Sequence, residues 1–184
     1  MKSMSTTQNR HQSNLGYKLM AAYLRFREQF RKPEDLLHRI GLQDGQTVLD
    51  YGCGIGSYAI PAARIVGATG KVHALDIHPI AVERVQKRAK KEGLSNIVTI
   101  QSGLDTGLED ESIDFVLLFD VFTWVHEKEE LLKELHRVLK NTGTFSVIID
   151  HVDPIEFRKI IEKTALFEIT SQEDNFFILR KASN

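Results

Sequence analysis

The sequence predicts a single α/β domain, built on a doubly wound, mostly parallel sheet of seven strands with helices on both faces. Short apolar stretches typical of strands alternate along the chain with amphipathic helical stretches, which is the pattern of a parallel sheet. The first strand leads directly into a glycine-rich turn that opens a helix. Only the residues 172–175 separate the last two strands. A parallel crossover needs about a dozen residues or more, so the seventh strand must be antiparallel to its neighbour.

Composition agrees with one folded domain. The 184 residues are 42% hydrophobic and 27% charged, and this length is enough for a sizeable core. No apolar run approaches the length of a membrane span, and residues 1–14 lack the apolar core of a signal peptide, so we expect a cytoplasmic protein. The single cysteine, Cys53, excludes an internal disulfide and a cysteine-based zinc site, and no metal site is predicted.

The N-terminal part is predicted to form a flexible tail over 1–14 and two helices over 15–41, ahead of the sheet domain at 42–184. In the first helix, apolar residues recur every three or four positions. Tyr17 and Met20 belong to this helix and are candidates for a lid over the site. Residues 1–39 hold eight Lys/Arg against three Asp/Glu, a net charge of +5. Such an arm suits an acidic substrate or RNA, although we favour the simpler interpretation of a solvated helix face.

The other elements follow in order. Strands are predicted at 47–51, 71–76, 96–101, 113–119, 144–150, 166–171 and 176–180. Helices are predicted at 57–66, 79–93, 127–140 and 154–164, with prolines in the first turns of three of them, where backbone N–H groups lack partners. Residues 103–111 form a loop in place of a helix, and residues 141–143 cap the helix before them.

The turn after the first strand is the strongest candidate for a binding site. Asp50 ends that strand, and Gly52, Gly54 and Gly56 follow at alternate positions. A backbone without Cβ atoms lets a nucleotide approach closely, and free N–H groups at a helix start favour polar or anionic ligand atoms. A tight turn without a ligand is the alternative, but three alternating glycines after a buried strand make it the weaker one.

Polar groups at other strand ends extend this site, since ligands of doubly wound sheets bind beyond the carboxyl ends of the strands. Asp76 follows Gly56 by 20 residues, a position from which an acid can accept hydrogen bonds from both ribose hydroxyls. Its alternative role is to compensate the dipole of the next helix. Ser57 stands where the dinucleotide fingerprint has its third glycine, which disfavours NAD(P).

These motifs together resemble those of the class I S-adenosylmethionine (SAM)-dependent methyltransferases. Residues 48–56 resemble their motif I, residues 70–76 their second motif, and residues 112–116 and 135–143 their fourth strand and the segment before the fifth. The resemblance covers about residues 45–181, is closest to small-molecule and quinone-type enzymes, and fits the antiparallel last strand. It implies SAM as methyl donor, S-adenosylhomocysteine (SAH) as product and a small-molecule acceptor, with nucleic acid not expected and the oligomeric state open.

The resemblance also implies which residues contact the donor. Its methionine end would be held by Asp50, Phe119 and the backbone of Gly52, Cys53, Gly54 and Gly56.

At the other end of the donor, Asp76 would bind the ribose and Ile77 would pack on the adenine. Ser102, Gly103 and Leu104 would border the adenine edge. Many relatives carry an aspartate where Ser102 stands, which puts this adenine contact in question.

Methyl transfer from a sulfonium is an in-line displacement, so the protein mainly aligns the nucleophile and excludes water. A base helps when the nucleophile starts protonated, and His151, Asp120 and His126 are the candidates. Capping of the next helix explains His151 equally well, backbone hydrogen bonding is favoured slightly for Asp120, and a helix start is favoured for His126. Phe122 and Trp124 are candidates for the wall of the substrate pocket, with core packing as the simpler role.

Three other functions stay open. The basic N-terminal helix could serve an RNA methyltransferase, and the chain could instead be a non-catalytic SAM-binding partner subunit. A nicotinamide-dependent oxidoreductase is more distant, because of the glycine spacing and the antiparallel last strand.

Overall fold

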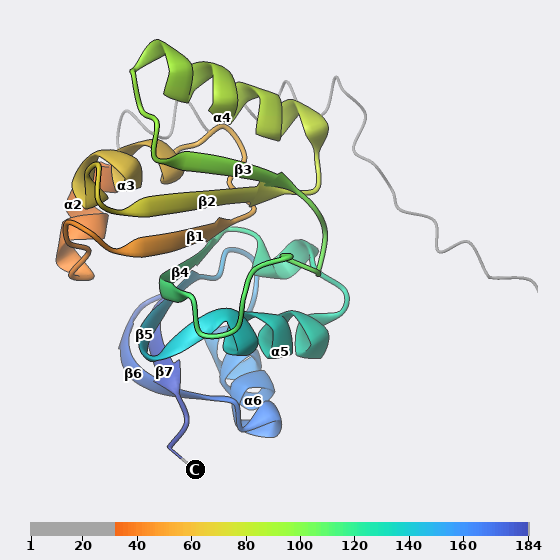
Figure 1. Ribbon diagram of the computed structural model, residues 1–184. Helices are drawn as coiled ribbons and strands as arrows, with labels where there is room; N and C mark the ends of the chain where they lie inside the picture. Colours follow the sequence, from red (N-terminus) through yellow and green to blue (C-terminus); the bar gives the residue numbers. More distant parts are fainter. Residues whose placement is uncertain (1–31, 184) are drawn as a thin grey trace, which may run out of the picture.

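A computed structural model describes residues 32–183, in which helices and strands alternate around one sheet (Figure 1). The predicted tail, the helix over 15–31, Tyr17 and Met20 lie outside the described residues. The strands are β1 (Thr47–Tyr51), β2 (Lys71–Asp76), β3 (Ile97–Gln101), β4 (Ile113–Phe119), β5 (Leu139–Ile148), β6 (Phe167–Glu173) and β7 (Phe176–Lys181). The helices are α2 (Pro33–Arg39), α3 (Ala59–Val66), α4 (Pro79–Lys91), α5 (Lys128–Val138), α6 (Pro154–Thr164) and the 3₁₀ turn η1 (Phe122–Trp124).

The sheet confirms the predicted fold class. Its strand order is β3-β2-β1-β4-β5-β7-β6, and β1 to β5 pair in parallel. Strand β7 is antiparallel to both β5 and β6. A turn of two residues, Asp174 and Asn175, joins β6 to β7, which is too short for a parallel crossover. Ile148 at the end of β5 pairs with Phe176 at the start of β7. The first residues of β7 therefore lie at the edge formed by the carboxyl ends of the parallel strands.

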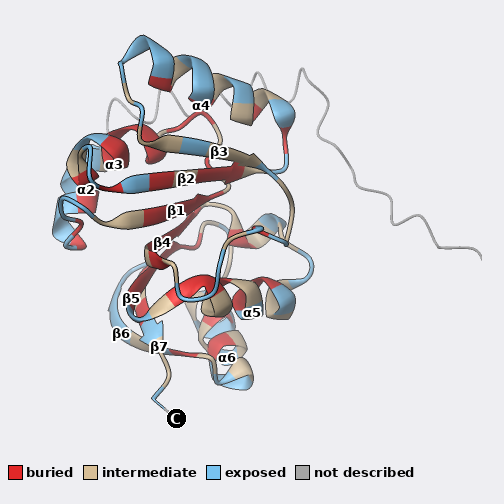
Figure 2. Cartoon of the chain, viewed as in Figure 1, coloured by how far each residue is buried: buried red, intermediate tan, exposed pale blue. Residues whose placement is uncertain are grey.

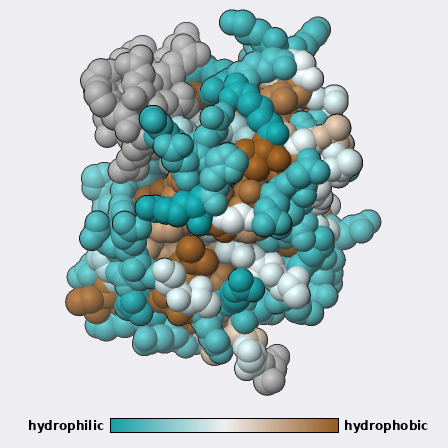
Figure 3. Space-filling model, turned by 90° about the vertical axis from the view of Figure 1, so that its left-hand side faces the viewer, coloured by the Kyte–Doolittle hydropathy of each residue, from teal (hydrophilic) through white to brown (hydrophobic). Residues whose placement is uncertain are grey.

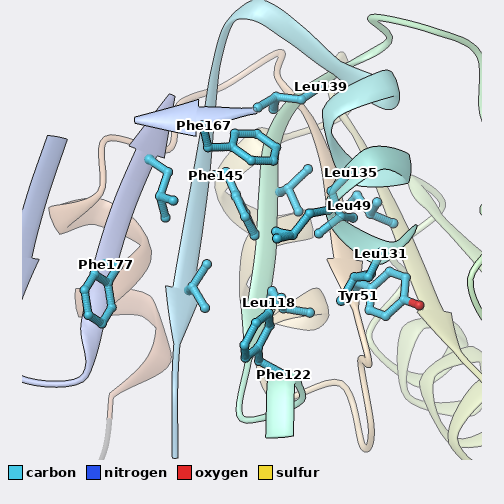
Figure 4. Packing of buried hydrophobic residues seen from close by; sticks show 14 of the residues in the cluster. Leu49, Tyr51, Leu118, Phe122, Leu131, Leu135, Leu139, Phe145, Phe167 and Phe177 are labelled. Atoms are coloured by element: carbon cyan, nitrogen blue, oxygen red, sulfur yellow. The ribbon is translucent and has the colours of Figure 1, made fainter. Parts of the chain in front are cut away.

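Hydrophobic cores cover both faces of the sheet. One core packs α5 and α6 against residues such as Leu49, Leu118 and Phe145 (Figure 4). The other packs α2, α3 and Val85 of α4 against residues such as Val48 and Phe115. Adjacent residues of β1 thus serve opposite cores, as a strand buried on both faces requires. Figure 2 shows burial concentrated in β1, β2 and β4 and on the sheet-facing sides of the helices.

The outer surface differs from this interior. Figure 3 shows the face at the left of Figure 1, which is mainly hydrophilic, with hydrophobic side chains gathered toward its middle. Within residues 32–183, no helix is both long enough and apolar enough to cross a membrane.

Two predicted boundaries are wrong for a tertiary reason. Helix α5 ends at Val138, two residues early, and β5 begins at Leu139 because Leu139 pairs with Ile113. Residues 141–143, predicted as a helix cap, lie within β5 at a register shift. There a Cβ on Gly143 would come within 2.5 Å of the Leu139 side chain. Helix α3 also begins two residues late, at Ala59.

Candidate cofactor and acceptor site

The glycine turn after β1 is held by hydrogen bonds within the chain. The N–H groups of Gly52 and Cys53 donate to the Leu75 carbonyl at 2.8 and 2.9 Å, and that of Gly56 donates to the Cys53 carbonyl at 2.8 Å. The Gly54 N–H donates to Asp76 Oδ2 at 2.9 Å. The N–H groups of Gly52, Cys53, Gly54 and Gly56 therefore already have acceptors within the chain, which β2 and the turn itself supply.

Conformation and packing explain why glycines occupy this turn. Gly52, Gly54 and Gly56 have φ values of 79°, 53° and 82°, a region that side chains other than glycine rarely adopt. A Cβ on Gly52 would lie 2.3 Å from the Val121 side chain, so the segment after β4 packs directly on the turn. The turn thus offers a ligand a surface of fixed shape.

Asp50 is the most unusual polar residue of the site. Its side chain is buried, with 2% of the residue exposed, and it accepts a hydrogen bond from the backbone N–H of Ala59. Its Oδ2 has no hydrogen-bond partner among residues 32–183. Burial, assisted by the nearby charge of Asp76, raises the pKa of Asp50 from 3.8 to about 7. A buried carboxylate oxygen without a partner fits a cationic ligand group, such as an ammonium, that would satisfy it.

Asp76 connects the glycine turn to the start of α4. Its Oδ1 accepts from the His78 N–H at 2.8 Å and its Oδ2 from the Gly54 N–H at 2.9 Å. Burial raises the pKa of Asp76, while these two donors act in the opposite direction. The Ile77 N–H is a third backbone donor to this carboxylate. A carboxylate has about four acceptor positions, so the side chain retains acceptor capacity for a ligand hydroxyl.

Ile77 and Gly103 lie next to Asp76 and face each other. Ile77 is 51% exposed, which is unusual for a large apolar residue at the end of a buried strand. A Cβ on Gly103 would lie 3.9 Å from Ile77 Cδ1, and among residues 32–183, apart from its two neighbours in the chain, no other residue comes within 4 Å of it. These two residues therefore border an open apolar surface at the ends of β2 and β3, of the kind that accepts one face of a planar ring.

Ser102 and Leu104 take other roles in this loop. The Ser102 hydroxyl donates to the Asp105 carbonyl, so it is already used within the loop. Leu104 packs partly against the core beneath α5.

A cavity of about 360 Å³ is lined in part by Tyr58, which follows the glycine turn by two residues. Its lining residues come from α2, from the residue before α3, from the end of β5, and from the β6–β7 turn with its flanking residues, and they include Arg39, Tyr58, Ile148 and Phe176. Phe119, which was predicted at the site, does not line the cavity but packs against two residues that do. Its ring centroid lies 4.6 Å from that of Tyr58 and 6.4 Å from that of Phe176.

Arg39 closes one side of the cavity. Its guanidinium lies 5.5 Å from the Phe176 ring centroid and 3.1 Å from the carboxylate of Glu173. Sequence reasoning missed Arg39, Tyr58 and Phe176, because it searched only the carboxyl ends of the strands. The antiparallel direction of β7, which the sequence did indicate, was the signal that its first residues belong to the same edge.

Asp120 and His151 lie directly after β4 and in the loop after β5, and both have left-handed backbone conformations, with φ of 62° and 64°. Such conformations in residues other than glycine store strain and cluster at functional sites. The Asp120 N–H donates to the Ile148 carbonyl at 3.0 Å, which joins the ends of the two strands. His151 is exposed.

The loop that carries His151 is tied to its neighbours through Asp150. The Asp150 carboxylate accepts from Asn175 Nδ2 at 2.8 Å, and its carbonyl accepts from the Thr123 hydroxyl. The β6–β7 turn and η1 are thus connected to the loop after β5.

The structure moves two predicted residues out of this region. Phe122 is fully buried, with its ring centroid 5.0 Å from that of Phe157, so it is a core residue and does not line the cavity. His126 lines a separate cavity between α5 and α6 that shares no lining residue with the first. Trp124 is 67% exposed, which excludes core packing. In the described part of the chain, no group of three or more His, Cys, Asp or Glu is arranged to hold a metal ion.

This chain matches the family model and the sequences of methyltransferases. Residues 42–177 match the model of a methyltransferase domain family. The chain is 30% identical over 142 residues to a demethylmenaquinone methyltransferase of Geobacillus kaustophilus, covering 77% of this chain and 60% of the relative. It is 35% identical over 114 residues to a sterol 24-C-methyltransferase of Gibberella zeae, covering 61% of this chain and 29% of that relative. The match thus spans less than two thirds of either relative.

Among solved structures, a SAM-dependent methyltransferase from Aquifex aeolicus superposes with a TM-score of 0.75. It is 27% identical in sequence, and the superposition covers 85% of this chain and 93% of that one.

Proposed function

Since this chain belongs to the class I SAM-dependent methyltransferases, we propose that it transfers a methyl group from SAM to a small-molecule acceptor. The observation that carries this proposal is the buried Asp50, whose unpartnered carboxylate oxygen adjoins the glycine turn. Asp50 would hold the ammonium group of the donor, Asp76 its ribose hydroxyls, and Ile77 with Gly103 its adenine. The backbone of the turn would shape the methionine end, with Phe119 beside it.

SAM, when bound, supplies a methyl group already activated on a sulfonium. The protein's own contribution is then to bring the acceptor into line, to keep water away and, where needed, to take a proton. The Asp120 N–H donates to the carbonyl of Ile148, a cavity residue, and His151 follows Asp150, which accepts from Asn175 of the cavity. We therefore propose His151 and Asp120 as the groups that orient the acceptor or accept its proton.

The cavity supports an acceptor with a flat apolar part. Tyr58, Ile148 and Phe176 offer apolar and aromatic surface, and Phe119 extends it toward the donor region. A volume of about 360 Å³ falls within the range of ordinary small-molecule sites. Two relatives are named for demethylmenaquinone and for a sterol, both small molecules.

Calorimetric titration with SAM and SAH, with NADH as control, tests the donor part of this proposal. We expect both SAM and SAH to bind and NADH not to bind. Folded protein that binds neither SAM nor SAH would contradict the proposal. Transfer of a labelled methyl group to quinone-like, phenolic and sterol acceptors then tests the acceptor part.

The same experiments separate the alternatives. Co-purifying RNA with steeply salt-dependent binding would favour an RNA methyltransferase. Tight SAM binding without transfer to any acceptor would favour a non-catalytic subunit.

A further inference from the structure

We infer that Glu134, on α5, is a positioning residue that holds the adenine-side loop in place through Thr106. This loop is defined here as residues 102–108, between β3 and β4. The inference rests on the proposed function, because it assigns Glu134 a role in donor binding without contact to the donor.

The adenine-side loop needs such support because it contains no helix and no strand. A segment without its own backbone ladder must satisfy its buried polar groups through other partners. Ordering it also costs conformational entropy at every residue. In this loop Thr106 is 2% exposed, although it is polar and lies on a surface connection.

Glu134 supplies the partners that Thr106 requires. Its Oε1 accepts from the Thr106 N–H at 3.0 Å and from the Thr106 hydroxyl at 2.5 Å. The same hydroxyl accepts from the Leu108 N–H at 3.2 Å. One carboxylate oxygen thus fixes both the backbone and the side chain at the centre of the loop.

Arg137 holds Glu134 in the orientation that these contacts need. Its Nε and Nη2 donate to the two Glu134 carboxylate oxygens at 2.8 and 2.7 Å, and its Nη1 donates to the Leu108 carbonyl at 2.8 Å. This guanidinium is the main reason that the pKa of Glu134 is lowered to about 2. Glu134 therefore remains an ionised acceptor across the usual pH range, and charge-assisted hydrogen bonds of this kind are the stronger ones.

The same loop reaches the proposed donor site at Gly103. The Gly103 carbonyl accepts from the Tyr51 hydroxyl at 2.9 Å. Tyr51 follows Asp50 in β1, its ring lies in the core, and its hydroxyl points out of the core cluster (Figure 4). The loop is thus tied to β1 at Gly103 and to α5 at Thr106. Releasing the second tie would let Gly103 move away from Ile77 and widen the surface proposed for adenine.

A double-mutant cycle on SAH affinity tests this inference. We expect Glu134→Ala to raise the dissociation constant for SAH by roughly 5- to 20-fold, and Thr106→Val by less, because valine removes the hydroxyl contact but keeps the Thr106 N–H. The double variant should bind SAH no more weakly than Glu134→Ala alone, because both changes act on the same tie. Thr106→Ser keeps the hydroxyl and should restore the affinity. The turnover number at saturating SAM should stay close to that of the parent, since neither residue touches the reacting atoms.

Glu129→Ala is the matched control. Glu129 lies on the same helix and pairs with Lys163 at 2.5 Å, away from the loop, so its removal should leave SAH affinity unchanged. Unchanged affinity in folded Glu134→Ala, additive effects in the double variant, or failure of Thr106→Ser to restore binding would each overturn the inference. Parent protein that binds no SAH would instead contradict the proposed function.

Discussion

The proposed donor region and the proposed acceptor region of this molecule are built by different means. The proposed donor region comprises the glycine turn, Asp50, Asp76 and the Ile77–Gly103 surface. Backbone hydrogen bonds between the turn and β2, together with those that the Asp76 carboxylate accepts from backbone N–H groups, hold it together. The proposed acceptor region comprises the cavity beside Tyr58 and the loops after β4 and β5. Residues of α2 and of the β6–β7 turn line the cavity together, and the exposed side chains of Arg39 and Glu173 form an ion pair between them.

This contrast teaches how one fold can serve several acceptors. Backbone contacts in the donor region depend little on side-chain identity beyond the glycines and two acids. In the proposed acceptor region, exposed side chains such as Arg39 of α2 and Glu173 next to the β6–β7 turn help to define the surface, so substitutions of these residues change the cavity without disturbing the sheet.

The largest effect that would sharpen this comparison is expected from Asp76→Ala. Asp76 is proposed to bind the ribose and also orders the N–H groups of Gly54 and His78. Its loss should weaken SAH binding about 100-fold or more, because hydrogen bonds to a charged group are among the most costly to remove. Calorimetry measures this. Cys53→Ala, in the same turn, is the control, and equal affinities in the two variants would refute the ribose assignment.

A smaller effect, in the acceptor region, is expected from His151→Ala. If His151 orients or deprotonates the acceptor, turnover should fall roughly 100-fold, the lower end of what a general base contributes, with SAH affinity unchanged. Initial rates with labelled SAM measure it. His126→Ala is the matched control, since His126 lines a different cavity. Unchanged turnover in the His151 variant would remove it from the catalytic candidates.

The smallest expected effect concerns stability and Asp50. With its pKa raised to about 7 on folding, the folded chain keeps a proton that the unfolded chain loses above about pH 4. Stability therefore falls as pH rises from about 4 to about 7 and stays lower above that range. Asp50→Asn removes the free-energy cost of ionising a buried carboxyl group. It should stabilise the free protein by on the order of 2 kcal/mol near pH 8, with little gain near pH 4.

Urea unfolding at the two pH values, without donor, measures this difference. Glu83→Gln, at an exposed carboxylate on α4, should show no gain that depends on pH in this way. The Asp50 variant should also bind SAH more weakly, since the amide cannot balance an ammonium. If the free energy of unfolding of Asp50→Asn equals that of the parent at both pH values, ionising the buried carboxyl group costs no stability.

Most of the fold could be predicted because its signals are local. The helix bounds of α6, the strand β4 and the direction of β7 follow from proline positions, apolar runs and the length of one turn. The end of α5 could not be predicted, because pairing of Leu139 with Ile113 determined it across the chain. The simpler roles favoured for Phe122 and His126 are confirmed, since Phe122 packs in the core and His126 directly precedes the N-cap residue of α5.

The sequence by itself determined the glycines that adopt positive φ and the acids at the ends of β1 and β2, from which the donor region is proposed. These are requirements of single positions and can be recognised without knowledge of what packs against them. Tertiary structure alone decided which hydrogen bonds satisfy the glycine turn, and that Glu134 supports a loop 28 residues away in sequence. It also decided that Arg39, Tyr58 and Phe176 share a cavity. The physical reason is that each of these contacts joins two segments that are distant in the sequence. Either segment alone supplies only the donor, only the acceptor or only part of the cavity lining, so the contact exists only once the two segments pack together.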